Sequence, residues 1–127
     1  MKKICTFGLL LAIALLAAGF LWRMGEGTSS SVKEAVAQAL GEKYNRPADS
    51  YVLDTDKNTG SFAKGSVRVE GEAGGGLWFA SKTADGWALA FDGNGIMPCD
   101  IADGYDFPPF MVPSCLDAGN DNALRQR

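Results

Sequence analysis

Hydrophobic positions follow three different patterns along the chain. Residues 4–22 form a run of 19 without a charge, and residues 32–44 carry apolar side chains three or four positions apart. From residue 51 onward, apolar and polar positions alternate between turns rich in glycine. These patterns predict, in order, a membrane-spanning or signal helix, an amphipathic helix and antiparallel strands.

The N-terminal run is long enough to cross a membrane. At 1.5 Å per residue it reaches roughly 28 Å, about the thickness of the hydrocarbon core of a bilayer. Lys2 and Lys3 precede the run and a single Arg23 follows it, which favours an N-terminus in the cytoplasm and the rest of the chain outside. Residues 1–24 are therefore predicted to be a signal anchor, which makes the protein a single-pass protein of the inner (cytoplasmic) membrane held through residues 4–22.

A cleaved signal peptide is the alternative interpretation of the same segment. The small residues Ala17-Ala18-Gly19 have the spacing that a signal peptidase reads, and cleavage there would release a secreted chain beginning at Phe20. The run is longer than the about 7–15 residues of a usual signal-peptide core, which favours the anchor. Cys5 lies at the start of the apolar run instead of at its end, so a lipoprotein is not favoured.

A helix is predicted to follow a short linker. Residues 25–30 are small or polar, as in a flexible tether. Ser31 and Glu34 fit a capping box, in which each side chain bonds to the backbone amide of the other residue at a helix N-terminus. Asn45 and Pro47 are expected to end the helix. The alanines on its apolar face indicate close packing against a sheet. That face comprises Val32, Ala35, Val36, Ala39, Leu40 and Tyr44.

The following part of the chain predicts a small antiparallel sheet. Four candidate strands cover residues 51–55, 62–70, 77–82 and 87–91. The turns between them contain glycine, and Asp85-Gly86 has the sequence of a tight hairpin turn. The predicted fold class is therefore α+β, with one helix packed on a curled antiparallel sheet of three to four strands in residues 31–116. Residues 117–127 lack apolar periodicity and are predicted to be a disordered tail.

Several motifs carry a resemblance to known proteins. They are Ala63-Lys64-Gly65-Ser66-Val67, the run Gly74-Gly75-Gly76-Leu77-Trp78-Phe79-Ala80-Ser81-Lys82, Asp85-Gly86-Trp87, Asp92-Gly93-Asn94-Gly95 before Pro98-Cys99, and Phe107-Pro108 before Cys115. With the order of one helix and then strands, they resemble a family of small exported bacterial proteins of unknown function with a cystatin-like layout, in which a curled sheet wraps an N-terminal helix. The resemblance covers residues 31–116 and implies an architecture without an activity.

Cys99 and Cys115 are predicted to form a disulfide. They bracket residues 100–114, a segment with three prolines and little predicted regular structure. In an oxidising compartment, a bond that closes a loop of about 15 residues contributes roughly 3 kcal/mol to stability. The alternatives fit less well, because a zinc site needs further Cys or His ligands and a redox pair favours a Cys-x-x-Cys spacing.

Composition argues against several classes of function. The net charge of −3 becomes −6 when Lys2, Lys3 and Arg23 are left out, since 9 basic residues then face 15 acidic ones. This acidity disfavours a nucleic-acid partner. The chain has no histidine, the most common general base and transition-metal ligand. No catalytic residue, metal site or cofactor is therefore predicted, and the protein is not expected to be an enzyme.

Two short stretches come close to known sites but depart from them. Residues 54–60 alternate oxygen-bearing side chains as calcium loops do, yet the glycine comes one residue late and Gly65 stands at the twelfth position, where a glutamate belongs. Protease-inhibiting cystatins carry Gln-x-Val-x-Gly, and the comparable Val67-Arg68-Val69-Glu70-Gly71 lacks the glutamine. A hairpin turn and a strand end are the favoured interpretations.

Five aromatic residues are the candidates for a binding surface. They lie on the last two strands and between the two cysteines: Trp78, Trp87, Tyr105, Phe107 and Phe110. Exposed aromatic side chains supply contact area for a partner, although the favoured interpretation of those on the strands is that they fill two sides of a small core. The sequence thus predicts a non-catalytic, membrane-tethered interaction module that binds an unidentified envelope protein or peptide. The alternative is a structural accessory subunit that joins a membrane assembly through residues 4–22.

Overall fold

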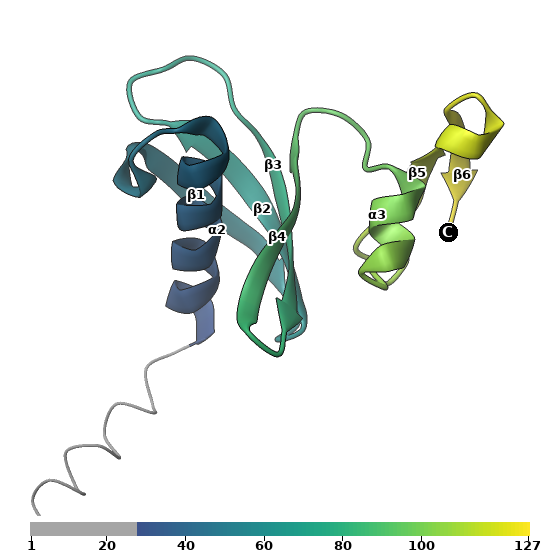
Figure 1. Ribbon diagram of the computed structural model, residues 1–127, viewed down its shortest axis with the longest axis horizontal. Coiled ribbons are helices and arrows are strands. Elements are labelled where there is room, and N and C mark those ends of the chain that lie inside the picture. Colours follow the sequence, from purple (N-terminus) through teal and green to yellow (C-terminus); the bar gives the residue numbers. More distant parts are fainter. Residues whose placement is uncertain (1–27) are drawn as a thin grey trace, which may run out of the picture.

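The computed structural model describes residues 28–127, in which no helix is both long and apolar enough to cross a membrane. The predicted signal anchor, its alternative cleavage site and residues 25–27 of the linker lie outside the described residues. Helix α2 (Thr28–Tyr44) packs on an antiparallel sheet in the order β1 (Tyr51–Asn58), β2 (Phe62–Val69), β3 (Gly76–Thr83) and β4 (Gly86–Gly93). Next come α3 (Cys99–Gly104) and a hairpin of β5 (Ser114–Asp117) and β6 (Ala123–Gln126) (Figure 1). The predicted α+β class, with one helix on an antiparallel sheet, is confirmed, and the sheet has four strands.

Helix α2 begins earlier than its sequence signals predict. It starts at Thr28, so residues 28–30, assigned to the linker, are helical and Ser31 lies inside the first turn instead of at the cap. No glycine or proline separates Thr28 from Val32, and the backbone there has nothing to interrupt the helix. At the other end, Asn45 adopts a left-handed φ of 54° and ends the helix as predicted.

The apolar face of α2 packs against one face of the sheet. Val32, Val36 and Leu40 are buried, whereas Tyr44 at the end of the helix is half exposed. Tyr51 at the start of β1 donates a hydrogen bond from its hydroxyl to the Leu40 carbonyl, 3.3 Å away. The buried residues of this helix-side core are Val32, Val36, Leu40, Ala63, Trp78 and Ala80.

Trp78 is the largest side chain of the helix-side core, and it depends on a glycine. It is fully buried, and its indole N–H donates to the Ser66 carbonyl at 3.0 Å. Gly65 of β2 lies opposite Trp78. A Cβ atom at residue 65 would lie 1.8 Å from the Asp54 carbonyl oxygen and 2.8 Å from Trp78 Cζ2. Only glycine at this position lets the indole ring lie over β2.

The opposite face of the sheet is covered in part by the C-terminal unit, residues 97–127. Successive side chains of a strand point to opposite faces, so Phe62 and Phe79 point away from α2, next to the inward-facing Ala63 and Trp78. The buried Phe107 ring lies with its centroid 5.0 Å from that of Phe62 and 6.1 Å from that of Phe79. Figure 1 shows α2 and the C-terminal unit on opposite sides of the strands. The buried residues of this second core are Met97, Cys99, Ala102, Phe107, Met111, Val112 and Cys115.

The last part of the chain corrects the prediction of a disordered tail at residues 117–127. Strand β6 pairs with β5 over four residue pairs, although every β6 side chain is exposed. The Arg127 guanidinium donates to the carbonyls of Phe107 and Val112, at 2.7 and 3.2 Å. The order of this segment therefore comes from backbone pairing and from a terminal arginine, neither of which produces apolar periodicity.

The disulfide between Cys99 and Cys115 is confirmed, with the two Cα atoms 4.9 Å apart. It joins the first residue of α3 to β5, and both cysteines are buried. The intervening segment is more regular than predicted, because its first six residues, counted from Cys99, form helix α3. Pro98 precedes this helix with a φ of −59°, a conformation that suits the entry into a helix.

Candidate functional site

The five aromatic residues predicted as a binding surface do not lie together. Trp78 and Phe107 are 0% and 1% exposed and belong to the two cores on opposite faces of the sheet. Trp87 borders the helix-side core, with the Lys82 ammonium 5.9 Å from the centre of its ring. Tyr105 and Phe110 are 37% and 58% exposed on the C-terminal unit. Trp78 and Phe107 are inaccessible to a partner, so the prediction of one aromatic surface is corrected.

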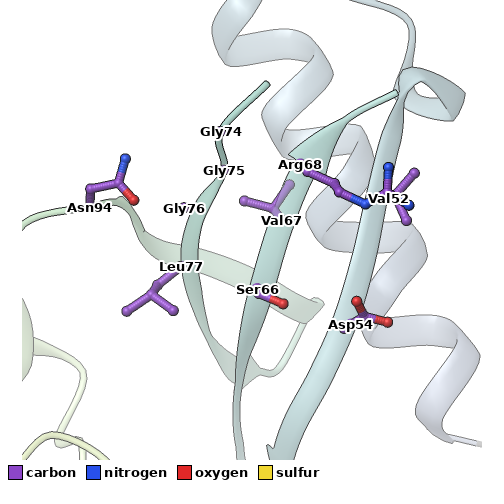
Figure 2. Close-up of a pocket in the computed structure, with 10 residues that line it drawn as sticks. All are labelled: Val52, Asp54, Ser66, Val67, Arg68, Gly74, Gly75, Gly76, Leu77 and Asn94. Atoms are coloured by element: carbon purple, nitrogen blue, oxygen red, sulfur yellow. The ribbon is translucent and has the colours of Figure 1, made fainter. Parts of the chain in front are cut away.

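A different surface is open to a partner. The C-terminal unit covers only one end of the sheet face that points away from α2, around Phe62 and Phe79. At the other end the strands border a hollow of about 340 Å³ (Figure 2). Its lining residues are Val52, Asp54, Ser66, Val67, Arg68, Gly74, Gly75, Gly76, Leu77 and Asn94.

Three neighbouring strands place the side chains of the hollow. Val52 lies opposite Arg68, and Asp54 lies opposite Ser66, in the pairing of β1 with β2. Ser66 in turn lies opposite Leu77 of β3. Since side chains alternate along a strand, these five project from the face opposite to Leu53, Val67 and Trp78, which contact the helix-side core.

A glycine rim, residues 74–76, forms one side of the hollow. Gly74 has a left-handed φ of 88°, which favours glycine. A Cβ atom at Gly75 would lie 2.7 Å from the Val67 carbonyl oxygen, and one at Gly76 would lie 3.3 Å from the backbone of Gly93. The rim can therefore approach β2 and β4 closely because it has no side chains.

The side chains of the hollow offer both charge and apolar area. Arg68 forms no ion pair with any acidic side chain of residues 28–127, in contrast to Arg46, Arg125 and Arg127, each of which does. In Figure 2 the Arg68 side chain extends from β2 toward Val52 on β1. Asp54 likewise forms no ion pair within the described part of the chain. A guanidinium, a carboxylate, a hydroxyl and two aliphatic side chains thus face the same space.

The end of α2 is tied to the sheet next to the rim. The carboxylate of Asp92 at the end of β4 is only 6% exposed, and it accepts hydrogen bonds from Lys43 Nζ at 2.6 Å and from the Tyr44 hydroxyl at 2.5 Å. These hydrogen bonds raise the pKa of Lys43 and of Tyr44 above their ordinary values. A second hollow of about 230 Å³ lies between this contact and the rim. Asp92 on the border of the second hollow already binds the end of α2, so the first hollow is the candidate site.

The side chains of the described region do not assemble a metal centre. In residues 28–127 no three His, Cys, Asp or Glu side chains come together in a way that could hold a metal ion. The calcium-like stretch consists of the end of β1 and a turn, in which the Asn58 side-chain oxygen accepts from the Gly60 amide at 2.8 Å. The Asn58 oxygen thus serves the turn itself, and Asp54 at the other end of the stretch faces the hollow.

The chain was compared with protein-family models, curated proteins and solved structures, and no match was found. The resemblance to small exported bacterial proteins with a cystatin-like layout therefore stays a prediction. The function has to be argued from the site.

None of the residues of the hollow belongs to the predicted aromatic surface, because they are glycine, aliphatic, polar or charged residues. A signal for them exists in the alternation of β2, where Ser66 and Arg68 occupy the positions between Gly65, Val67 and Val69. Two polar residues on one face of a central strand indicate that this part of the face is open to solvent. This alternation predicts which face of β2 is open to solvent. It does not predict where the glycine rim lies, because the position of the rim depends on β3 and β4.

Proposed function

We propose that this protein is a membrane-tethered, extracytoplasmic interaction module without catalytic activity, which binds a polypeptide segment of an envelope partner in the hollow. The observation that carries the proposal is the open end of the sheet face with Arg68, which has no acidic partner among residues 28–127. The uncovered end leaves this guanidinium and the neighbouring Val52 and Leu77 side chains within reach of a partner.

A polypeptide suits the hollow better than a small molecule does. The hollow is bounded by one sheet face and one rim, so a compact ligand would keep much of its surface in water, whereas binding pockets bury most of their ligand. An extended segment can instead cross β1, β2 and β3 and place several side chains on them. Arg68 can bind a carboxylate of the segment through two parallel hydrogen bonds.

The direction of α2 supports a position of the hollow away from the membrane surface, where a partner can reach it. The C-terminal residues of α2, Lys43 and Tyr44, bond to the end of β4 beside the rim. The helix has 17 residues, a length of about 25 Å, so its start lies far from the hollow. A tether that enters at Thr28 therefore leaves the hollow at the end of the domain away from the membrane.

Site-specific photo-cross-linking in the native envelope tests this proposal. Leu77 in the hollow and Leu124 on β6 are 43% and 53% exposed, and a photoreactive amino acid at each gives a matched pair. We expect a protein adduct from position 77 that disappears in the Arg68→Glu variant, and no such adduct from position 124. An adduct of equal yield from both positions, or none from position 77, would contradict the proposal.

A further inference from the structure

Phe110 is the most exposed of the large hydrophobic side chains in the described residues, at 58%. It lies in the C-terminal unit between Pro109 and Met111, which is buried. The Lys57 ammonium lies 5.2 Å from the centre of the Phe110 ring. Lys64 donates from Nζ to the Met111 carbonyl at 3.2 Å. An exposed aromatic ring and two ammonium groups thus share one small surface.

This surface lies at the end of the domain where α2 begins. Lys57 is the last residue but one of β1, and the start of β1 is fixed next to the end of α2 by the Tyr51–Leu40 hydrogen bond. The start of α2 and the turn between β1 and β2 therefore lie at the same end of the molecule, as Figure 1 shows.

The length of chain outside the described residues limits how far this end can lie from a membrane. Five residues, 23–27, separate Trp22 at the end of the apolar run from Thr28 at the start of α2. Fully extended, the six residue steps from Trp22 to Thr28 span at most about 22 Å. The end of the domain that carries Phe110 is therefore held next to the bilayer surface whenever the apolar run is inserted.

We propose that Phe110 and Lys57 contact the headgroup region of the membrane that anchors the chain, with a preference for anionic lipids. This inference rests on the tether of the proposed function, but not on its binding site. An aromatic side chain beside a cation suits this region, since the ring enters the boundary of the acyl chains while the ammonium binds lipid phosphate. Asp56 precedes Lys57 in the chain and offsets one of the two positive charges, so the positive charge of this surface is modest. The contact would orient the hollow away from the bilayer.

The test uses the purified full chain in nanodiscs. A photoreactive amino acid replaces Phe110, and the control replaces Leu77 at the other end of the sheet. We expect lipid adducts from position 110 only. In discs containing phosphatidylglycerol, Lys57→Gln should lower the adduct yield about fivefold, the effect of one basic residue at an anionic surface. In discs of phosphatidylcholine the same change should have little effect.

Each outcome bears on one of the two proposals. If the chain stays in the disc, three results overturn the membrane contact alone. They are equal lipid adducts from positions 110 and 77, no lipid adduct from position 110, and an adduct yield that Lys57→Gln leaves unchanged in both lipids. Release of the chain from the disc overturns the tether and the membrane contact together. Lipid adducts from position 110, without any partner adduct from position 77 in the envelope, support the membrane contact and overturn the binding function.

Discussion

The two faces of the sheet are covered in different ways. One face packs against a single helix whose apolar residues recur every three or four positions, and the other packs against a C-terminal unit assembled from a short helix, a disulfide and a hairpin. The helix runs along the whole sheet, whereas the C-terminal unit covers one end. The uncovered end is where the candidate site lies. The C-terminal unit has a less regular sequence pattern than α2, and the face that it covers is the one that leaves room for a partner.

The largest effect is expected from a substitution that removes a buried side chain from the helix-side core. Trp78→Ala removes the largest buried side chain next to α2, and we expect a loss of about 3–5 kcal/mol in the free energy of unfolding. Denaturant unfolding followed by circular dichroism measures it. Trp87→Ala is the matched control, since Trp87 only borders this core and should cost less. Equal losses in the two variants would contradict the assignment of Trp78 to the centre of the core.

The second prediction concerns the covalent link of the C-terminal unit. Reduction of the Cys99–Cys115 bond should lower the free energy of unfolding by roughly 3 kcal/mol, because the chain between the cysteines gains freedom in the unfolded state. Hydrogen exchange should become faster in α3, β5 and β6, while α2 and the sheet keep most of their protection. The Cys99→Ala/Cys115→Ala double variant should behave in the same way under oxidising conditions. Uniform loss of protection in α2 as well would show that the two coverings unfold as one unit.

A smaller effect is expected from acid on the C-terminal hairpin. The Asp103 carboxylate accepts hydrogen bonds from Arg125 and Arg127. The bond with Arg125 is the main cause that holds the pKa of Asp103 below its ordinary value of 3.8. A carboxyl group whose pKa is lowered by folding stabilises the folded state at pH values above its ordinary pKa. This stabilisation is lost as the pH falls through the folded-state pKa.

Nuclear magnetic resonance spectra of β6, recorded between about pH 5 and pH 2, can follow this loss. The Asp103→Asn variant is the control, and it should show weak β6 order at every pH, with no transition of its own in this range. An identical acid transition in the variant would show that another carboxyl group is responsible.

The smallest effect on stability is expected where the proposed function is most sensitive. Arg68→Ala removes an exposed side chain without an ion pair among the described residues, so the free energy of unfolding should change by no more than about 0.5 kcal/mol. Partner capture from position 77 should nevertheless fall strongly. Arg46→Ala, which removes an arginine from an exposed pair with Glu72, is the control and should leave the capture unchanged. A parallel loss of capture and of stability in Arg68→Ala would point to a structural role.

Elements whose signals are local could be predicted from the sequence alone. Val32, Val36 and Leu40 recur on one side of a helix, Asn45 ends it, and glycine-rich turns separate four strands, because a helix and a hairpin are formed by residues close together in the chain. The Cys99–Cys115 disulfide was also predictable, since only these two of the three cysteines follow the apolar run.

Which faces of the sheet are covered depends on contacts between residues far apart in the chain. Strand β6 has no apolar side to detect, and its order depends on pairing with β5 and on contacts of Arg127 with Phe107 and Val112. Trp78 and Phe107 looked alike in the sequence as candidates for a surface, yet each is buried by residues far away in the chain. The hollow depends on three strands, a glycine rim and the incomplete reach of the C-terminal unit. Exposure is a property of such long-range packing, and no local pattern of residues contains it.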